Sequence, residues 1–137
     1  KAATKKKSTS EITWQNYVDD HLLAAKTVSA ACFAGHDGNI WATSQGFGAT
    51  AAEIKFIISN MGRTDVFALN GLNIGGLRYI FLSGDDKIIR GKKGSSGVHI
   101  MKTVQAVIVS VYEEPIMAEQ CAATTEKLGD YLVSLGY

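Results

Sequence analysis

The sequence predicts an α+β fold, in which a central antiparallel β-sheet is flanked by helices. Apolar residues recur at helical spacing near both ends of the chain, while the middle holds short apolar runs typical of strands. One proline and 14 glycines indicate short elements joined by tight turns. With 137 residues, 46% of them apolar and 20% charged, the chain has the size and composition of one globular domain.

The first predicted element is a helix over roughly Thr13–Ala25. Trp14, Val18 and Leu22 recur at helical spacing, with Tyr17 beside them. Thr13 is a residue type whose side-chain oxygen accepts hydrogen bonds from the first free N–H groups of a helix. We therefore expect the helix to begin directly after Thr13.

A β-hairpin is predicted next. Residues 28–35 (VSAACFAG) form an apolar run typical of a buried strand, and residues 40–44 (IWATS) form its return strand. The turn between them contains Asp37-Gly38, a pair favoured in tight hairpin turns.

A second helix and four more strands are predicted in the middle of the chain. Thr50 can cap a helix from Ala51 to about Asn60, with Ile54, Ile57 and Ile58 on one face. The strands are expected near residues 68–74, 77–83, 87–91 and 97–103.

The last two predicted elements are a central strand and a long helix. Residues 106–112 (AVIVSVY) form an unbroken apolar run, as in a strand buried on both faces, and Pro115 ends it. The helix is expected over about Ala118–Leu135. Its apolar stripe consists of Cys121, Thr125, Leu128, Leu132 and Leu135.

Residues 1–12 differ from the rest of the chain, because they hold four lysines against one glutamate. We interpret them as a flexible extension or a cloning remnant, in preference to a functional basic arm, and residues 13–137 as one domain. The net charge of the whole chain is +1, so the remainder is slightly acidic. A nucleic-acid partner is therefore not expected.

Residue types that carry catalysis or bind metals are present but not clustered. Cys32 and Cys121 lack CxxC spacing, so we expect two buried free thiols rather than a disulfide. His21, His36 and His99 are isolated, so we predict surface or turn histidines and no metal site. The sequence has no nucleophile elbow, phosphate-binding loop or dinucleotide fingerprint. These observations indicate a binding protein without a cofactor, not an enzyme.

The aromatic residues are the first candidate binding feature. Trp14 and Tyr17 share a face of the first helix, Trp41 lies on the hairpin, and Tyr131 and Tyr137 belong to the last helix or its end. If the terminal helices pack side by side, these rings can form a shallow groove suited to a polyproline II ligand. They can equally be core residues, and from the pattern alone both readings stay open.

Basic residues form the second candidate feature. Arg90, Lys92, Lys93 and Lys102 surround a glycine-rich turn, and on a strand Arg90 and Lys92 point the same way. Such a patch can bind a phosphorylated headgroup or an acidic protein surface. A solvated edge that discourages strand aggregation is the alternative, and the pattern alone favours it.

Five segments of the chain together match a known family of proteins. They are WQNYVDDHL (14–22), GHDGNIWA (35–42), IRGKKGSSG (89–97), VYEEP (111–115) and EKLGDYL (126–132). In order and spacing they resemble the profilin family, and they look more like plant and amoeboid profilins than the vertebrate form. The resemblance covers essentially Trp14 to Tyr137, and its most specific parts are the start of the first segment and the end of the last.

The resemblance implies an antiparallel sheet with the N- and C-terminal helices packed side by side. It also implies a cytoplasmic, cytoskeleton-associated protein that binds monomeric actin and regulates its polymerisation. Further expected partners are proline-rich proteins such as formin-type polymerisation factors, and phosphatidylinositol 4,5-bisphosphate at the membrane surface.

The same resemblance assigns residues to each expected site. The polyproline groove matches Trp14, Tyr17, Trp41, Tyr131 and Tyr137, and the actin contacts match Arg78, Lys102 and Lys127. The phosphoinositide site matches Arg90, Lys92, Lys93 and Lys102.

Two alternative functions come from other classes. The basic patch over residues 88–102 could make the protein a phosphoinositide-sensing membrane adaptor without significant actin binding. A small-ligand sensor on a related α+β scaffold is the other, because fold does not dictate function. It requires a deep apolar pocket, which the packed core runs do not indicate.

Overall fold

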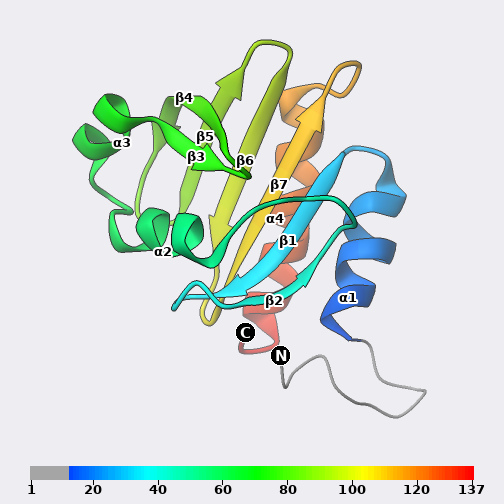
Figure 1. Cartoon of the computed structure of the whole chain (residues 1–137). Helices are drawn as coiled ribbons and strands as arrows, with labels where there is room; N and C mark the ends of the chain where they lie inside the picture. The colour runs from blue at the N-terminus through cyan, green and yellow to red at the C-terminus, as the bar shows by residue number, and fades with distance from the viewer. Residues whose placement is uncertain (1–12) are drawn as a thin grey trace.

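The computed structural model describes residues 13–137, which form one antiparallel sheet with helices on both faces (Figure 1). The sheet has seven strands in the order β2-β1-β7-β6-β5-β4-β3. The predicted extension over residues 1–12 lies outside the described residues. None of the helices between residues 13 and 137 combines the length and apolar character that crossing a bilayer requires.

The elements alternate along the chain as helix, hairpin, helices, meander and helix. The strands are β1 (Ala30–Gly35), β2 (Ile40–Thr43), β3 (Leu72–Ile74), β4 (Leu77–Gly84), β5 (Ile88–Lys93), β6 (Ser96–Lys102) and β7 (Ala106–Glu113). The helical elements are α1 (Trp14–Asn16), the π-helical turn η2 (Tyr17–Leu22), the 3-10 turn η3 (Leu23–Ala25), α2 (Ala51–Ser59), α3 (Thr64–Asn70) and α4 (Ala118–Ser134). The predicted α+β fold with an antiparallel sheet is confirmed.

The first helix begins where its cap predicts. The Thr13 side chain accepts a hydrogen bond from the backbone N–H of Asn16, and the Asn16 side chain accepts one from the backbone N–H of Thr13. The helix then widens into the π-helical turn η2. Val18 and Leu22 stay fully buried through this turn.

The second helix is also confirmed, and Glu53 in its first turn makes contacts beyond the cap. Thr50 and Glu53 form a reciprocal capping box at the start of α2. The Glu53 carboxylate also accepts hydrogen bonds from the backbone N–H groups of Gly75 (2.8 Å) and Gly76 (2.9 Å) in the β3–β4 turn. Burial would raise the pKa of Glu53, but these N–H donors outweigh it and lower the pKa below its ordinary value.

Replacing Glu53 by Ala is therefore expected to lower the free energy of unfolding by about 1–3 kcal/mol at neutral pH, because charged hydrogen bonds are lost in a partly solvated site. Because the folded pKa is depressed, the wild-type contribution is present above the unfolded pKa of about 4.3 and is lost as the pH falls through the folded value. Urea denaturation at a series of pH values measures this. The exposed Glu114, replaced in the same way, is the control; an equal acid-induced loss of stability in wild type and Glu53→Ala contradicts this role.

The strand predicted over residues 68–74 is largely wrong. Residues 64–70 form the helix α3, and only Leu72–Ile74 form a strand. α3 has seven residues and buries only Phe67, so no helical periodicity is visible in the sequence. Gly71, with φ +74°, separates the helix from β3.

Two hydrophobic cores lie on the two faces of the sheet. On one face α2 and α3 cover Ile89, Val98, Ile100 and their neighbours. On the other face α4 and the helical segment 14–25 cover Phe33 and Ile108. The terminal helices therefore lie on the same face, as predicted (Figure 1).

The two cysteines are free and buried, as predicted, and they belong to different cores: Cys32 lies on the α2 face and Cys121 on the α4 face. Burial raises the pKa of each thiol to about 12. Both thiols are therefore protonated and unreactive at neutral pH.

The predicted apolar stripe of the last helix needs one correction. Cys121, Thr125, Leu128 and Leu132 are buried, but Leu135 is 49% exposed, because α4 ends at Ser134.

His99 is also placed differently from the prediction of a surface or turn residue. It lies in the middle of β6 and is 2% exposed. Alternation along β6 turns His99 and Met101 toward α4, where Met101 packs against Gly129 and His99 meets Glu126.

Candidate binding surfaces

The predicted aromatic residues come together around Trp14. Its ring centroid lies 4.9 Å from that of Trp41, 5.4 Å from Tyr137 and 5.5 Å from Tyr17. Burial raises the pKa of Tyr17, and the nearby hydroxyls of Tyr131 and Tyr137 raise it further. Tyr131 lines a shallow hollow together with His21, whose ring centroid lies 5.2 Å from that of Tyr17. We call the five predicted residues the aromatic cluster.

The aromatic cluster has a buried floor and an exposed rim. Trp14 and Tyr17 are 6% and 9% exposed and pack on Phe33 of β1, so they also belong to the core. Trp41 is half-buried, whereas Tyr131 and Tyr137 are 50% and 43% exposed. Trp14 and Tyr17 are therefore core residues, while the exposure of the other rings leaves the groove reading a prediction.

The backbone of the last residue is held in place by the β6–β7 loop. The carbonyl of Tyr137 accepts a hydrogen bond of 2.8 Å from the Thr103 hydroxyl, and its N–H donates to the carbonyl of Leu132 at 2.9 Å. Gly136, with φ +94°, allows the chain to turn back after α4. The Tyr137 ring is thus set edge-on to Trp14, at an interplanar angle of 88°.

The predicted basic residues are not brought into one patch. Arg90 and Lys92 lie on the α4 side of β5, while Lys93 alternates to the opposite face. Lys102 lies at the far end of β6, five positions beyond the residue that pairs with Lys92, which is about 16 Å along the strand.

β4 supplies a surface that the sequence analysis missed. Tyr79 and Phe81 turn toward the α2 core, so alternation sends Arg78 and Ile80 to the other side. Leu82 lies at a register shift between Phe81 and Ser83, and it lines a hollow on that same side with Arg90 and His99. Ile80 is 70% exposed and Leu82 is 56% exposed, although both are apolar. With Arg90 and Lys92 of the neighbouring strand they form the open sheet face, defined by Arg78, Ile80, Leu82, Arg90 and Lys92.

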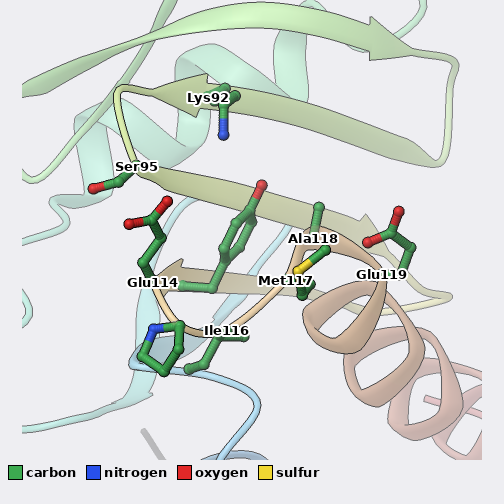
Figure 2. Close-up of a pocket in the computed structure, with 9 residues that line it drawn as sticks. Lys92, Ser95, Glu114, Ile116, Met117, Ala118 and Glu119 are labelled. Carbon is green, nitrogen blue, oxygen red and sulfur yellow. The ribbon is translucent and has the colours of Figure 1, made fainter.

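A hollow extends the open sheet face toward the start of α4. It has a volume of about 610 Å³ and is lined by residues of β5, the β5–β6 turn, β7, the β7–α4 loop and the first turn of α4. Figure 2 shows Lys92 across this hollow from Met117, with Glu114 and Glu119 on its rim. The lining mixes one base with two acids, so the hollow has no single charge preference.

The three residues matched to actin contacts lie on different surfaces. Arg78 belongs to the open sheet face, and Lys102 ends β6. Lys127 is exposed on the other side of α4, where it lines a shallow hollow with His21 and Tyr131 between α4 and η2. The fold does not bring these three side chains together, and their assignment stays a prediction.

Comparisons with known proteins agree with this architecture. Residues 12–137 match the family described as profilin. The chain is 54% identical over 126 residues to profilin of Drosophila melanogaster, across 92% of this chain and 100% of that protein. It is 42% identical to the solved structure of Acanthamoeba castellanii profilin IB, with a TM-score of 0.88 over 91% of this chain and 100% of that chain.

A more distant solved structure includes a ligand. Mouse profilin IIa in complex with a double repeat from the FH1 domain of mDia1 is similar, with a TM-score of 0.75 over 90% of this chain and 99% of that chain. Its sequence is 22% identical to this chain, so the likeness is one of fold.

Proposed function

The chain belongs to the profilin family, and on that premise we propose that it binds monomeric actin and proline-rich segments on two separate surfaces and thereby regulates actin polymerisation. The observation that carries the proposal is the aromatic cluster, in which rings from both ends of the chain share one surface. The protein acts by binding rather than by catalysis, in the cytoplasm and with the actin cytoskeleton.

The proposed proline-rich site is the aromatic cluster, formed by Trp14, Tyr17, Trp41, Tyr131 and Tyr137. A polyproline II helix is rigid before it binds, so docking it on rings costs little conformational entropy. The hydroxyls of the rim tyrosines can donate hydrogen bonds to the free carbonyls of such a ligand. The complex of mouse profilin IIa with a double repeat from the FH1 domain of mDia1 supports the proposal, because that protein has the same fold.

The proposed actin site is centred on the open sheet face. Ile80 and Leu82 supply apolar area that binding removes from water, while Arg78 and Arg90 supply charges that orient an acidic partner. Lys102 and Lys127 stay in the proposal as outlying contacts that steer association. Each lies on a different surface from the open sheet face, so neither is expected to dominate the affinity.

The two proposed sites do not share residues. One molecule can therefore hold an actin monomer on the open sheet face while its aromatic cluster is attached to a proline-rich protein. This arrangement raises the local concentration of actin at the polymerisation factor without any new contact.

Phosphoinositide binding through Arg90, Lys92, Lys93 and Lys102 is a further proposal, although only the first two of these residues lie on the same side of β5. Arg90 and Lys92 are exposed on the same side of β5 and could hold one phosphorylated headgroup together. Because Arg90 and Lys92 also belong to the proposed actin site, the lipid and actin would compete.

Replacing Tyr131 by Ala tests the proline-rich site without disturbing the core. We expect a loss of about 1–2 kcal/mol in binding a proline-rich peptide, because one ring of the rim is removed. The free energy of unfolding should change little, since this side chain is half exposed. Retention on a poly-L-proline column and calorimetry with a free peptide measure the binding, and urea denaturation measures the free energy of unfolding.

The matched control is Phe56→Ala, which removes an aromatic ring of similar exposure (44%) from α2 on the other face of the sheet. Equal weakening by both substitutions, or no retention of the wild type, would be incompatible with a proline-rich site at the aromatic cluster.

A further inference from the structure

His99 is a buried titratable side chain next to the open sheet face. Its side chain is 3% exposed, and its Nε2 atom lies 2.9 Å from Oε2 of Glu126 on α4. The same carboxylate oxygen lies 3.6 Å from Nη2 of Arg90, whose side chain is 52% exposed. One carboxylate oxygen is therefore shared between a buried imidazole and a half-exposed guanidinium.

The close contact between His99 and Glu126 is not a well-aligned hydrogen bond. Neither His99 Nε2 nor Glu126 Oε2 makes a hydrogen bond of good geometry within residues 13–137. The distance of 2.9 Å nevertheless brings the two atoms into contact. Because the two atoms are so close, a change of charge on the His99 ring strongly alters its interaction with the Glu126 carboxylate.

The other groups around His99 are mainly neutral. On β7, Ser110 pairs with His99 and its hydroxyl accepts a hydrogen bond from Thr125, and Tyr112 lines the same small hollow as His99. On α4, Cys121 is a buried protonated thiol, whereas Glu119 is an exposed carboxylate on the rim of that hollow. Arg90, the cross-strand neighbour on β5, and Glu126 are thus the charges that His99 feels most directly.

The pKa of the His99 imidazole lies below its ordinary value. Burial is the largest cause, and Arg90 acts in the same direction, while Glu126 acts in the opposite one. At neutral pH the ring is uncharged, so Glu126 and Arg90 neutralise each other. Protonation of His99 changes the net charge of the three groups from zero to +1.

We propose that the protonation state of His99 controls how firmly Glu126 holds Arg90, so that acidification releases the Arg90 side chain onto the open sheet face. The imidazolium is closer to the shared oxygen than the guanidinium is, and it has no water to solvate it. It therefore takes over the carboxylate charge. Arg90 is half exposed and can turn into solvent. Glu126 is a positioning residue for Arg90.

The functional consequence rests on the proposed actin site. Arg90 held by Glu126 has part of its charge neutralised, whereas a released Arg90 presents a full charge to an acidic partner. Binding on the open sheet face is then coupled to the uptake of a proton by His99.

NMR spectroscopy of the full chain tests the release directly. As the pH is lowered from about 7.5 to about 5, above the range in which carboxylates titrate, we expect the Arg90 Nε–Hε group to lose its heteronuclear NOE. The midpoint of this loss should coincide with the titration of the His99 ring. In Glu126→Gln, Arg90 should be mobile at every pH, and the pKa of His99 should fall further, since the carboxylate that raises it is gone.

Control variants distinguish the release of Arg90 from a general loss of structure at low pH. His21→Gln removes an exposed histidine of η2 and should leave the Arg90 response unchanged. His99→Gln should keep Arg90 held throughout; if this variant does not fold, wild type and Glu126→Gln decide the question. An Arg90 NOE that is constant in the wild type, or one that still falls with pH in Glu126→Gln, overturns the proposal.

Actin binding is the second readout. At the acidic end of the range the wild type should bind actin roughly threefold more tightly than His99→Gln, because one exposed charge contact contributes about this much. At neutral pH the two proteins should bind actin equally tightly. If actin does not bind at any pH, the proposed function fails, while the Arg90 measurement still decides the proton-controlled release. If actin binds with the same ratio at both pH values, the coupling is absent.

Discussion

Trp14→Ala is expected to have the largest effect of any single substitution in the aromatic cluster. The Trp14 ring contacts Tyr17, Phe33, Trp41 and Tyr137, and it is 6% exposed. Removing it should lower the free energy of unfolding by about 3–5 kcal/mol, because the cavity lies where both terminal helices meet the sheet. Binding of a proline-rich peptide should be abolished, since the floor of the proposed site is lost.

The control for Trp14→Ala must be a variant that loses a similar amount of stability. Phe67→Ala removes a ring that is 1% exposed in the other core and should cost a similar 3–5 kcal/mol. At a temperature and denaturant concentration where both variants are folded, Phe67→Ala should retain peptide binding and Trp14→Ala should not. Peptide affinity that follows stability alone in the two variants would refute a specific role for the aromatic cluster.

Ile80→Glu is expected to have the largest effect on actin binding. Ile80 is 70% exposed in the middle of the open sheet face, so a buried interface there must desolvate the new carboxylate. We expect a loss of at least about 2 kcal/mol in the free energy of actin binding, which is roughly 30-fold in Kd. The free energy of unfolding should change by about 0.5 kcal/mol or less, since the site is on the surface.

The matched control for this substitution is Phe56→Glu. Phe56 is 44% exposed on α2, and that helix packs on the other face of the sheet, so a carboxylate is introduced outside the open sheet face. Sedimentation or fluorescence assays with monomeric actin measure the affinities, and poly-L-proline retention should be normal for both variants. Normal actin affinity in Ile80→Glu would remove the open sheet face from the proposal.

The fold predictions succeeded where an element is specified by residues close together in the sequence, and they failed where it is not. Thr13 and Thr50 begin helices where expected, because a cap is decided within three residues of chain. α3 was missed because a seven-residue helix that buries one side chain carries no periodic pattern. His99 was misplaced because a histidine between apolar neighbours on β6 does not reveal whether a helix covers it.

The candidate sites divide in the same way. The resemblance to the family implied the members of the aromatic cluster as a set. The structure brings the rings of Tyr17, Trp41 and Tyr137 around Trp14, with Tyr131 at a neighbouring hollow. The basic residues are near one another in sequence, but alternation sends Lys92 and Lys93 to opposite faces, and the length of β6 separates Lys102 from both. The exposure of Ile80 and Leu82 could not be predicted, since a strand that is apolar on both sides usually lies in the middle of a core.

The amino-acid sequence alone determined the helices and strands whose caps, turns and apolar periods act over a few residues, together with membership of the family. Tertiary structure alone decided which strands α4 leaves uncovered and which charged side chains meet, because those depend on packing between segments distant in the chain. Glu126 of α4 shows the difference: nothing near it in the sequence indicates that its carboxylate lies between a buried histidine of β6 and an arginine of β5.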